Sequence, residues 1–187
     1  MTKKIYQLQI ALLGIKPKIW RRVLVNSDIS LVDLHRIIQT SMGWTNSHLH
    51  QFGAGRTWYS PEEFEVEDTK DSRKIKLNAL LQYENGKIKY IYDFGDHWVH
   101  DIILEKIFPF NKNAEIPVCT GGKRNCPPED CGSVSGYESM IKIIADTKHE
   151  EHDEWMEWLG GEFDPEYFNM EEINLMLKEE DYGCIWL

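Results

Sequence analysis

The side chains of this chain with the greatest capacity for chemistry stand in one run of nine residues, YDFGDHWVH, starting at residue 92. The run holds three aromatic rings, two carboxylates and two imidazoles, the last four being Asp93, Asp96, His97 and His100. A carboxylate beside an imidazole can act as a general base or supply part of a metal-ligand set. The same pairing describes a partly buried histidine with its hydrogen bonds satisfied, so the run is either a site or a folding corner.

Strand geometry divides this run between two faces of a sheet. If residues 95–96 form a two-residue turn between two strands, Asp93 lies diagonally across from His100 on one face. His97 and Asp101 then share the opposite face. The pattern therefore predicts that only half of the run can serve any one site.

A second pair of imidazoles, His48 and His50, stands on either side of Leu49. Alternation along a strand would point both rings to the same face, and this spacing suits chelation of a divalent metal such as zinc. The alternative interpretation is a pair of solvent-facing histidines around a core Leu49.

Three cysteines follow at a C-x6-C-x4-C spacing: Cys119, Cys126 and Cys131. They could staple a loop around zinc, although the C-x2-C knuckle typical of structural zinc is missing from this stretch. Ordinary buried, reduced thiols are the alternative.

Basic and aromatic side chains offer a further candidate site. Trp20 and Arg22 share one face of a predicted strand, where the guanidinium can stack on the indole, hold an anion or pair with a carboxylate of the chain. Binding of nucleic acid would have to use a small set of basic residues: Lys18, Arg21, Arg22, Lys123 and Arg124. The net charge of −10 opposes that use, because a polyanion would meet a repulsive overall field.

The elements that must position these groups follow from hydrophobic periodicity. Alternation predicts a hairpin over residues 5–13 and 19–25, and helical spacing predicts a helix from the cap Ser30 to the stop at Gly43. A short strand should follow over residues 47–53.

The second half of the chain changes character. Two strands over residues 87–93 and 97–107 are the clearest in the sequence. A Cys/Pro/Gly-rich loop should span about 109–135, followed by a helical part at about 136–180. The fold class expected is α+β: a mixed sheet with a β-grasp-like hairpin–helix–strand start and C-terminal helices packed on it.

Length and composition bound the rest. The 187 residues, 42% of them hydrophobic, suit a single domain over residues 1–187 with a substantial core. The chain carries no secretory signal pattern, no stretch apolar enough to span a membrane and no disulfide framework. We therefore expect a cytoplasmic protein with reduced thiols and no membrane partner.

Taken in order, the motifs of this chain resemble the plasmid pRiA4b ORF-3-like family. The matching segments are residues 19–22, 34–44, 48–52, 92–100, 126–132, 136–137 and 163–166. One departure is Ser133, where the family more often has a second glycine. The resemblance implies a soluble bacterial or archaeal α+β domain, found on plasmids and as a passenger of insertion elements, and it brings no established catalytic residues.

Three function classes follow. The favoured hypothesis is a binding or interaction protein associated with plasmids or mobile elements, whose partner would be another protein. The first alternative is a metal-dependent enzyme that uses the imidazoles and carboxylates at His48, His50, Asp93, Asp96, His97 and His100. The second alternative is a nucleic-acid-binding protein. The sequence leaves open whether the protein is an enzyme and which cofactor, if any, it takes.

Overall fold

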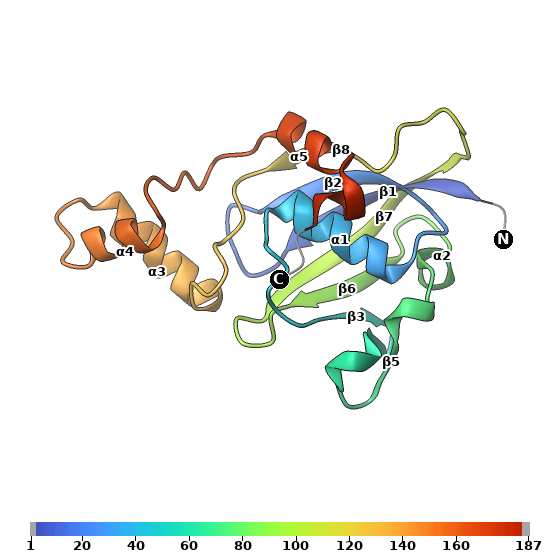
Figure 1. Ribbon diagram of the computed structural model, residues 1–187, viewed down its shortest axis with the longest axis horizontal. Helices are drawn as coiled ribbons and strands as arrows, with labels where there is room; N and C mark the ends of the chain where they lie inside the picture. Colours follow the sequence, from blue (N-terminus) through green and yellow to red (C-terminus); the bar gives the residue numbers. More distant parts are fainter. Residues whose placement is uncertain (1–2, 185–187) are drawn as a thin grey trace.

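An eight-stranded sheet with α1 across one face forms the centre of the molecule in the computed structural model, which describes residues 3–184 (Figure 1). The strand order is β5-β4-β3-β6-β7-β1-β2-β8, with neighbours antiparallel except for the parallel pair β4 and β5. The strands are β1 (Lys4–Leu12), β2 (Trp20–Asn26), β3 (His50–Ala54), β4 (Thr57–Ser60), β5 (Thr69–Asp71), β6 (Lys87–Tyr92), β7 (Trp98–Pro109) and β8 (Val118–Lys123).

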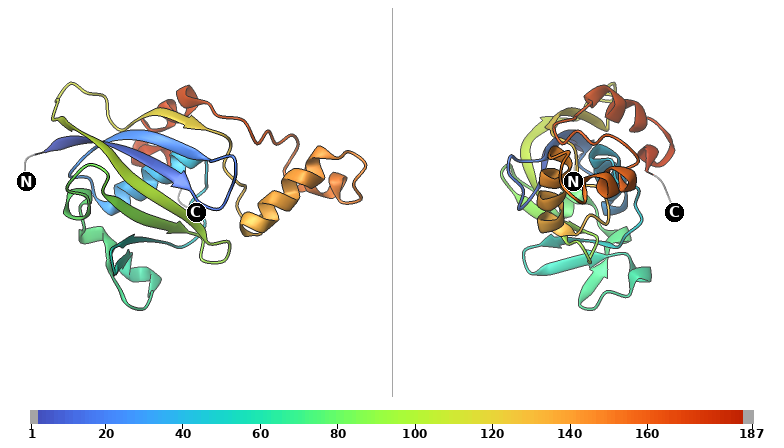
Figure 2. Two further views of the ribbon diagram at one scale, coloured as in Figure 1. Left: turned by 180° about the vertical axis from the view of Figure 1, so that it is seen from behind. Right: turned by 90° about the vertical axis from the view of Figure 1, so that its left-hand side faces the viewer.

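The helices occupy two places. Figures 1 and 2 show α3 and α4 extending beyond one end of the sheet, whereas α5 and η3 return to lie beside α1 and β8. They are α1 (Leu31–Met42), α2 (Leu77–Leu80), α3 (Ser133–Ala145), α4 (His152–Trp158) and α5 (Met170–Met176), with short 3-10 turns η1 (Glu62–Phe64), η2 (Ser72–Lys74) and η3 (Glu180–Gly183). Within residues 3–184 no helix is both long and apolar enough to cross a membrane. The predicted α+β class, mixed sheet and hairpin–helix–strand start are confirmed.

Helix α1 begins and ends where its sequence signals predict. The Ser30 hydroxyl accepts a hydrogen bond from the backbone N–H of Asp33 at 3.0 Å, which satisfies a donor that the first turn leaves unpaired. Gly43 adopts the left-handed conformation (φ 92°), and its N–H donates to Gln39. The buried face of α1, which includes Leu34 and Ile38, covers the sheet.

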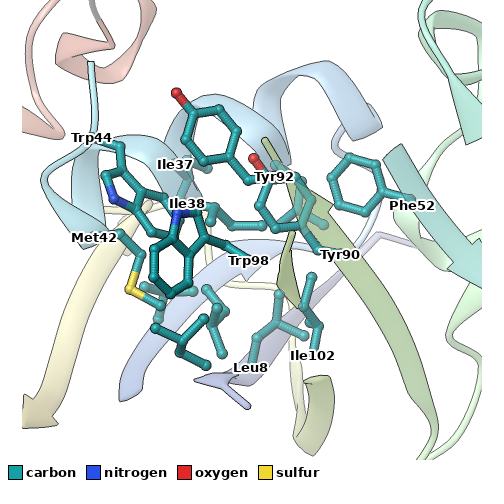
Figure 3. Packing of buried hydrophobic residues seen from close by; sticks show 14 of the residues in the cluster. Leu8, Ile37, Ile38, Met42, Trp44, Phe52, Tyr90, Tyr92, Trp98 and Ile102 are labelled. Carbon is teal, nitrogen blue, oxygen red and sulfur yellow. The ribbon is translucent and has the colours of Figure 1, made fainter. Parts of the chain in front are cut away.

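The core between α1 and the sheet is aromatic at the end that carries the candidate residues. Figure 3 shows the rings of Trp44, Tyr92 and Trp98 gathered on the inner face of the sheet. The Trp44 ring lies 4.8 Å from Tyr92 and 6.4 Å from Trp98, centroid to centroid. Trp98 and Tyr90 are fully buried, so this end of the sheet is a closely packed layer.

The turn between β6 and β7 differs from the expected two-residue turn. Tyr92 pairs with Trp98, so the loop has five residues, 93–97. Asp93 and His97 both take positive φ angles (57° and 58°), and the Asp93 carboxylate accepts from the N–H of Gly95 at 2.8 Å. The predicted sharing of sheet faces within the run was therefore wrong, because Asp93 and His97 belong to the loop.

Three further segments depart from expectation. Strand β3 begins at His50, so His48 lies in a bend before it and the predicted strand from residue 47 was too long. The Cys/Pro/Gly-rich segment contains β8, which hydrogen-bonds to β2 at the sheet edge. Residues 54–73, where no strand was predicted, carry β4 and β5, which extend the sheet at its other edge.

Candidate functional site

Three segments that are distant in sequence meet at the aromatic end of the sheet: the stretch after α1, the end of β6 and the loop before α3. The indole N–H of Trp44 donates to the carbonyl of Pro127 at 2.9 Å. The Glu129 carboxylate accepts the backbone N–H of Thr45 at 3.0 Å and contacts the Thr45 and Tyr92 hydroxyls. The loop before α3 is thus fastened to both other segments.

Glu129 is the anchor of this junction and carries its negative charge there. Burial alone would raise the pKa of its carboxyl group, but hydrogen bonds from Thr45, Tyr92 and Ser47 outweigh burial and hold that pKa below its ordinary value. Burial, and then the same contact with Glu129, raise the pKa of the Tyr92 phenol. Glu129 therefore acts as an ionised acceptor between three donors.

Next to this anchor, His48 lies between two carboxylates. Its Nε2 is 3.4 Å from Oδ1 of Asp130 and 3.8 Å from Oδ2 of Asp93. Asp93 is 6% exposed, whereas the Asp130 side chain is 71% exposed. One potential ligand atom from each of the three lies within 4.8 Å of the other two. Nitrogen and carboxylate oxygens at this separation form a group that a divalent cation could share.

His50 points elsewhere, so the expectation that it would join His48 in a chelating pair was wrong. Its ring stacks on that of His35 in α1, with centroids 3.5 Å apart and planes 8° apart. Burial, and then the neighbouring His35, lower the pKa of His50 well below its ordinary value. The split arises because the chain bends at His48 before strand β3 begins, which removes the alternation that a continuous strand would impose.

His35 belongs to a closed ring of four hydrogen bonds. The Asn46 backbone N–H donates to Gln39, the Gln39 amide donates to the Tyr90 hydroxyl, and His35 bridges Tyr90 (2.8 Å) and the Asn46 side-chain oxygen (2.7 Å). Because Asn46 offers an oxygen, His35 must carry its proton on Nε2 and accept the Tyr90 hydroxyl at Nδ1. Burial lowers the pKa of His35 to about 4, so the ring stays neutral.

The stacked pair lies at the wall of a cavity of about 460 Å³ between α1, the bend at His48 and η1. The cavity combines apolar side chains with three imidazoles and ion-paired arginines: Val32, His35, Arg36, Asn46, Ser47, His48, Leu49, His50, Pro61, Glu63, Phe64 and Arg73. The Nδ1 of His50 is buried and receives no hydrogen bond from any residue that the structure describes.

The other members of the opening run take structural or exposed positions. His100 is 0% exposed beneath Trp44, with its Nδ1 at 3.0 Å from the Trp98 carbonyl, and burial lowers its pKa to about 4. His97 is exposed. Asp96 accepts the N–H of Gly132 at 3.2 Å and so ties the hairpin loop to the start of α3. Asp93, in contrast, faces another titratable ring, with its Oδ2 3.8 Å from the Nε2 of His48.

Trp20 and Arg22 lie on the face of the sheet opposite to α1, so they do not share a site with the imidazoles. That face is turned toward the viewer in the left view of Figure 2, with α1 behind it. The Arg22 guanidinium sits 5.0 Å from the Trp20 ring and makes a bidentate pair with Glu105 at 2.6 and 2.8 Å. The internal salt bridge, one of the uses considered for this pair, accounts for the arginine.

The three loop cysteines are free and buried. Burial raises the pKa of all three thiols, that of Cys131 to about 12. Among the described residues 3–184, the sulfur atoms of Cys119, Cys126 and Cys131 do not all lie within 4.8 Å of one another, so they do not form a metal-ligand group. Protonated, separated thiols match the alternative of ordinary buried cysteines more closely than a zinc staple.

The predicted basic set is dispersed. Arg21 is buried, and its guanidinium donates to the carbonyls of Ser41 and Lys123. Arg124 is buried and pairs with Glu166 at 2.6 Å. With Arg22 held by Glu105, only Lys18 and Lys123 of the five predicted basic residues keep exposed side chains.

Sequence reasoning missed His35, Asn46, Glu129 and Asp130 as members of this region. His35 lies on the buried side of α1, where a histidine is usually interpreted as a core residue. The two acids lie in a loop, and hydrophobic periodicity does not predict where a loop lies in space. The available signal for three of them was their place inside the resembling segments, His35 in 34–44 and both acids in 126–132, whereas Asn46 lies outside these segments.

Comparison with known proteins identifies relatives of this chain. The sequence model described as "Plasmid pRiA4b ORF-3-like protein" matches residues 4–172. "Uncharacterized protein y4hQ" of Sinorhizobium fredii is 36% identical over 189 residues, covering 100% of this chain and 96% of that protein.

A solved structure is also similar: the crystal structure of protein of unknown function MM3350 from Methanosarcina mazei Go1. It superposes with a TM-score of 0.83 at 37% identity, covering 92% of this chain and 98% of that one. The match to the family model over most of the chain, together with these two relatives, shows that this chain belongs to the plasmid pRiA4b ORF-3-like family.

Proposed function

We propose that this protein binds a small organic molecule in the cavity between α1 and η1. The observation that carries the proposal is His50, which is 5% exposed, lines the cavity and has an Nδ1 that no residue within 3–184 satisfies. A buried polar atom without a partner costs free energy, so a ligand that supplies the missing hydrogen bond would recover it.

The cavity wall suggests the ligand's chemistry. Val32, Leu49 and Phe64 offer apolar contacts, while His50 offers an imidazole whose Nδ1 has no partner among the described residues. The arginines at the rim already pair with acids, Arg73 with Glu63 at 2.9 Å, so the site does not demand a highly charged ligand. A small, partly apolar molecule with a single hydrogen-bonding group fits best.

The rival functions have less support. Nucleic-acid binding would need a positive face, but Arg21, Arg22 and Arg124 are buried or paired with carboxylates. A metal-dependent enzyme would rest on the His48 cluster, which lacks the predicted partners His50, His97 and His100. We therefore still favour a binding function, but with a small molecule as the ligand in place of a protein partner.

The setting of this function is also a proposal. The family's description, which names a reading frame of the plasmid pRiA4b, supports an association with plasmids or mobile elements. Cys119, Cys126 and Cys131, which are free and buried, suit a reducing, cytoplasmic location. One shared hydrophobic cluster, running from Tyr6 in β1 to Met140 in α3 and Leu177 beyond α5, supports a single domain over residues 1–187.

The test uses two named probes, indole as a hydrogen-bond donor and benzoate as an acceptor. We expect one of them to shift the His50 imidazole resonances and to raise the melting temperature at concentrations up to about 10 mM, in the range of weak ligand affinities. Val32→Trp, which fills the cavity from α1, and His50→Phe, which keeps the ring but removes the nitrogens, should both weaken binding.

His97→Phe is the matched control, because it makes the same substitution at an exposed histidine outside the cavity lining. Unchanged His50 resonances with both probes would overturn the proposal. So would binding that Val32→Trp and His50→Phe leave at the native level.

A further inference from the structure

We propose that His48, Asp93 and Asp130 form a binding site for one divalent transition-metal ion of the zinc type. The proposed function depends on a hydrogen bond to His50. The metal site does not use His50 and can exist whether or not that hydrogen bond forms. The three ligands come from the bend before β3, the β6–β7 loop and the loop before α3.

The first argument is distance. Zinc binds nitrogen at about 2.0–2.1 Å and carboxylate oxygen at about 2.0–2.2 Å, which places the ligand atoms of a tetrahedral ion about 3.4 Å apart. The His48 Nε2 lies 3.4 Å from the Asp130 oxygen and 3.8 Å from the Asp93 oxygen. These separations are long for hydrogen bonds but near those of atoms that share one cation.

The second argument is that the group's polar atoms are unmatched. The buried Nε2 of His48 has no hydrogen-bond partner among the described residues. Asp93 is more than nine-tenths buried, and while its Oδ1 accepts the Gly95 N–H, its Oδ2 faces His48. A buried carboxylate needs a compensating charge, and a cation between the three side chains would supply it.

The third argument is the lack of a competing cation. Within residues 3–184 no lysine or arginine nitrogen pairs with Asp93 or Asp130 at 4.0 Å or less, the ion-pair contacts of both being with His48. This contrasts with Glu105, Asp101 and Glu166, which all pair with basic side chains. The charge of the two aspartates is therefore available to a metal ion.

The surroundings hold the ligands in place. Asp130 follows Glu129, which the Thr45 and Tyr92 side chains fix. Asp93 is held in its loop because its carboxylate accepts the Gly95 N–H and its backbone carbonyl accepts the His97 N–H. Three protein ligands are the number that catalytic zinc sites use, with further positions left to water or substrate. His48 also lines the cavity of the proposed function, so a bound ion would stand at its edge.

The experiment is a titration of the metal-free protein with Zn²⁺, read by calorimetry and by the nitrogen resonances of the histidine rings. We expect one Zn²⁺ per chain, with the Nε2 resonance of His48 shifted and those of His50 and His100 unmoved. Co²⁺ should give the visible absorption bands of a low-symmetry site with nitrogen and oxygen ligands.

Asp93→Asn and Asp130→Asn should each weaken Zn²⁺ binding by at least about 100-fold, since loss of a ligand exceeds the loss caused by its supporting residues. Asp96→Asn is the matched control, a carboxylate in the same loop that serves Gly132 instead. Asp130 is largely exposed, so Asp130→Asn should fold even if Asp93→Asn does not.

The inference would be overturned if Asp130→Asn bound Zn²⁺ with native affinity. It would also be overturned if Zn²⁺ did not shift the His48 resonance of the unaltered chain. Neither result would bear on the proposed function, because indole and benzoate report on His50. Conversely, failure of both probes at His50 would leave the Zn²⁺ titration at His48 unaffected.

Discussion

The imidazole rings of His35 and His50 lie face to face, 3.5 Å apart between centroids and 8° from parallel. One ring comes from the middle of α1 and the other from the first residue of β3, so the stack joins the helix to the sheet. Such a contact requires both rings to be neutral, because two imidazolium ions at this distance would repel strongly in a buried environment.

Stability should therefore fall as the solution is acidified below neutral pH. Burial lowers the pKa of His35 and of His100 to about 4, and that of His50 well below its ordinary value. Each ring binds its proton more weakly in the folded chain than in the unfolded one, so unfolding takes up protons and acid favours it. The stabilisation is complete above the unfolded pKa of about 6.5 and is lost as the pH falls toward 4.

His35 and His100 each contribute on the order of 3 kcal/mol over that window. Urea unfolding at pH 7.5, 6, 5 and 4.5 measures the effect, and His100→Phe should reduce its slope. An unfolding free energy that stays constant from pH 7 to pH 5 would contradict the neutral stack.

The hydrogen-bonded ring around His35 predicts a cooperative loss. Tyr90→Phe removes a hydroxyl that both accepts from Gln39 and donates to His35, which leaves two buried groups unsatisfied. We expect a loss of about 2 to 4 kcal/mol in unfolding free energy. Tyr83→Phe, at a tyrosine that is 72% exposed, should cost little.

A double-mutant cycle isolates the coupling. Gln39→Leu with Tyr90→Phe should cost less than the two single changes added together, since the second substitution removes a group that the first already left unpaired. Strict additivity would show that the ring does not act as a unit.

Much of the fold could be predicted from the sequence because local signals and the tertiary structure agree there. Helix α1 has both its Ser30 cap and its Gly43 stop, and the two hairpin-forming strand pairs carry regular alternation. The β6–β7 loop could not be predicted, because its length depends on Asp93 taking a left-handed backbone conformation that a non-glycine residue rarely adopts.

The candidate site was less accessible to sequence reasoning for a related reason. The partners of His48 and His50 are set by where separate segments meet in space, so the same two imidazoles that alternation placed together are turned apart by one bend. Asp130 becomes a neighbour of His48 through the anchoring of Glu129, which only the packed structure reveals.

Removal of the Glu129 carboxylate should loosen the segment that follows α1. Glu129→Ala leaves the Thr45 N–H and the Tyr92 hydroxyl without their acceptor, so we expect faster amide hydrogen exchange at Thr45 and a loss of about 2 to 3 kcal/mol. Glu129→Gln keeps one acceptor oxygen and should lie between the two. Glu151→Ala, at the exposed residue that precedes α4, is the control, and equal exchange in both alanine variants would refute the anchoring role.

The start of α3 depends on a close backbone approach at Gly136. A β-carbon added there would stand 2.0 Å from the carbonyl oxygen of Cys131, a distance that no side chain can relieve because the obstacle is backbone. Gly136→Ala should therefore displace the Cys131 turn and lower the unfolding free energy by about 2 kcal/mol or more, despite the better helix propensity of alanine. Ser135→Ala, exposed on the same turn of α3, should instead be neutral or slightly stabilising. Because Asp130 immediately precedes this turn, Gly136→Ala should also weaken Zn²⁺ binding at His48. If Gly136→Ala kept the native unfolding free energy, the prediction would be wrong, because the turn would then be free to move.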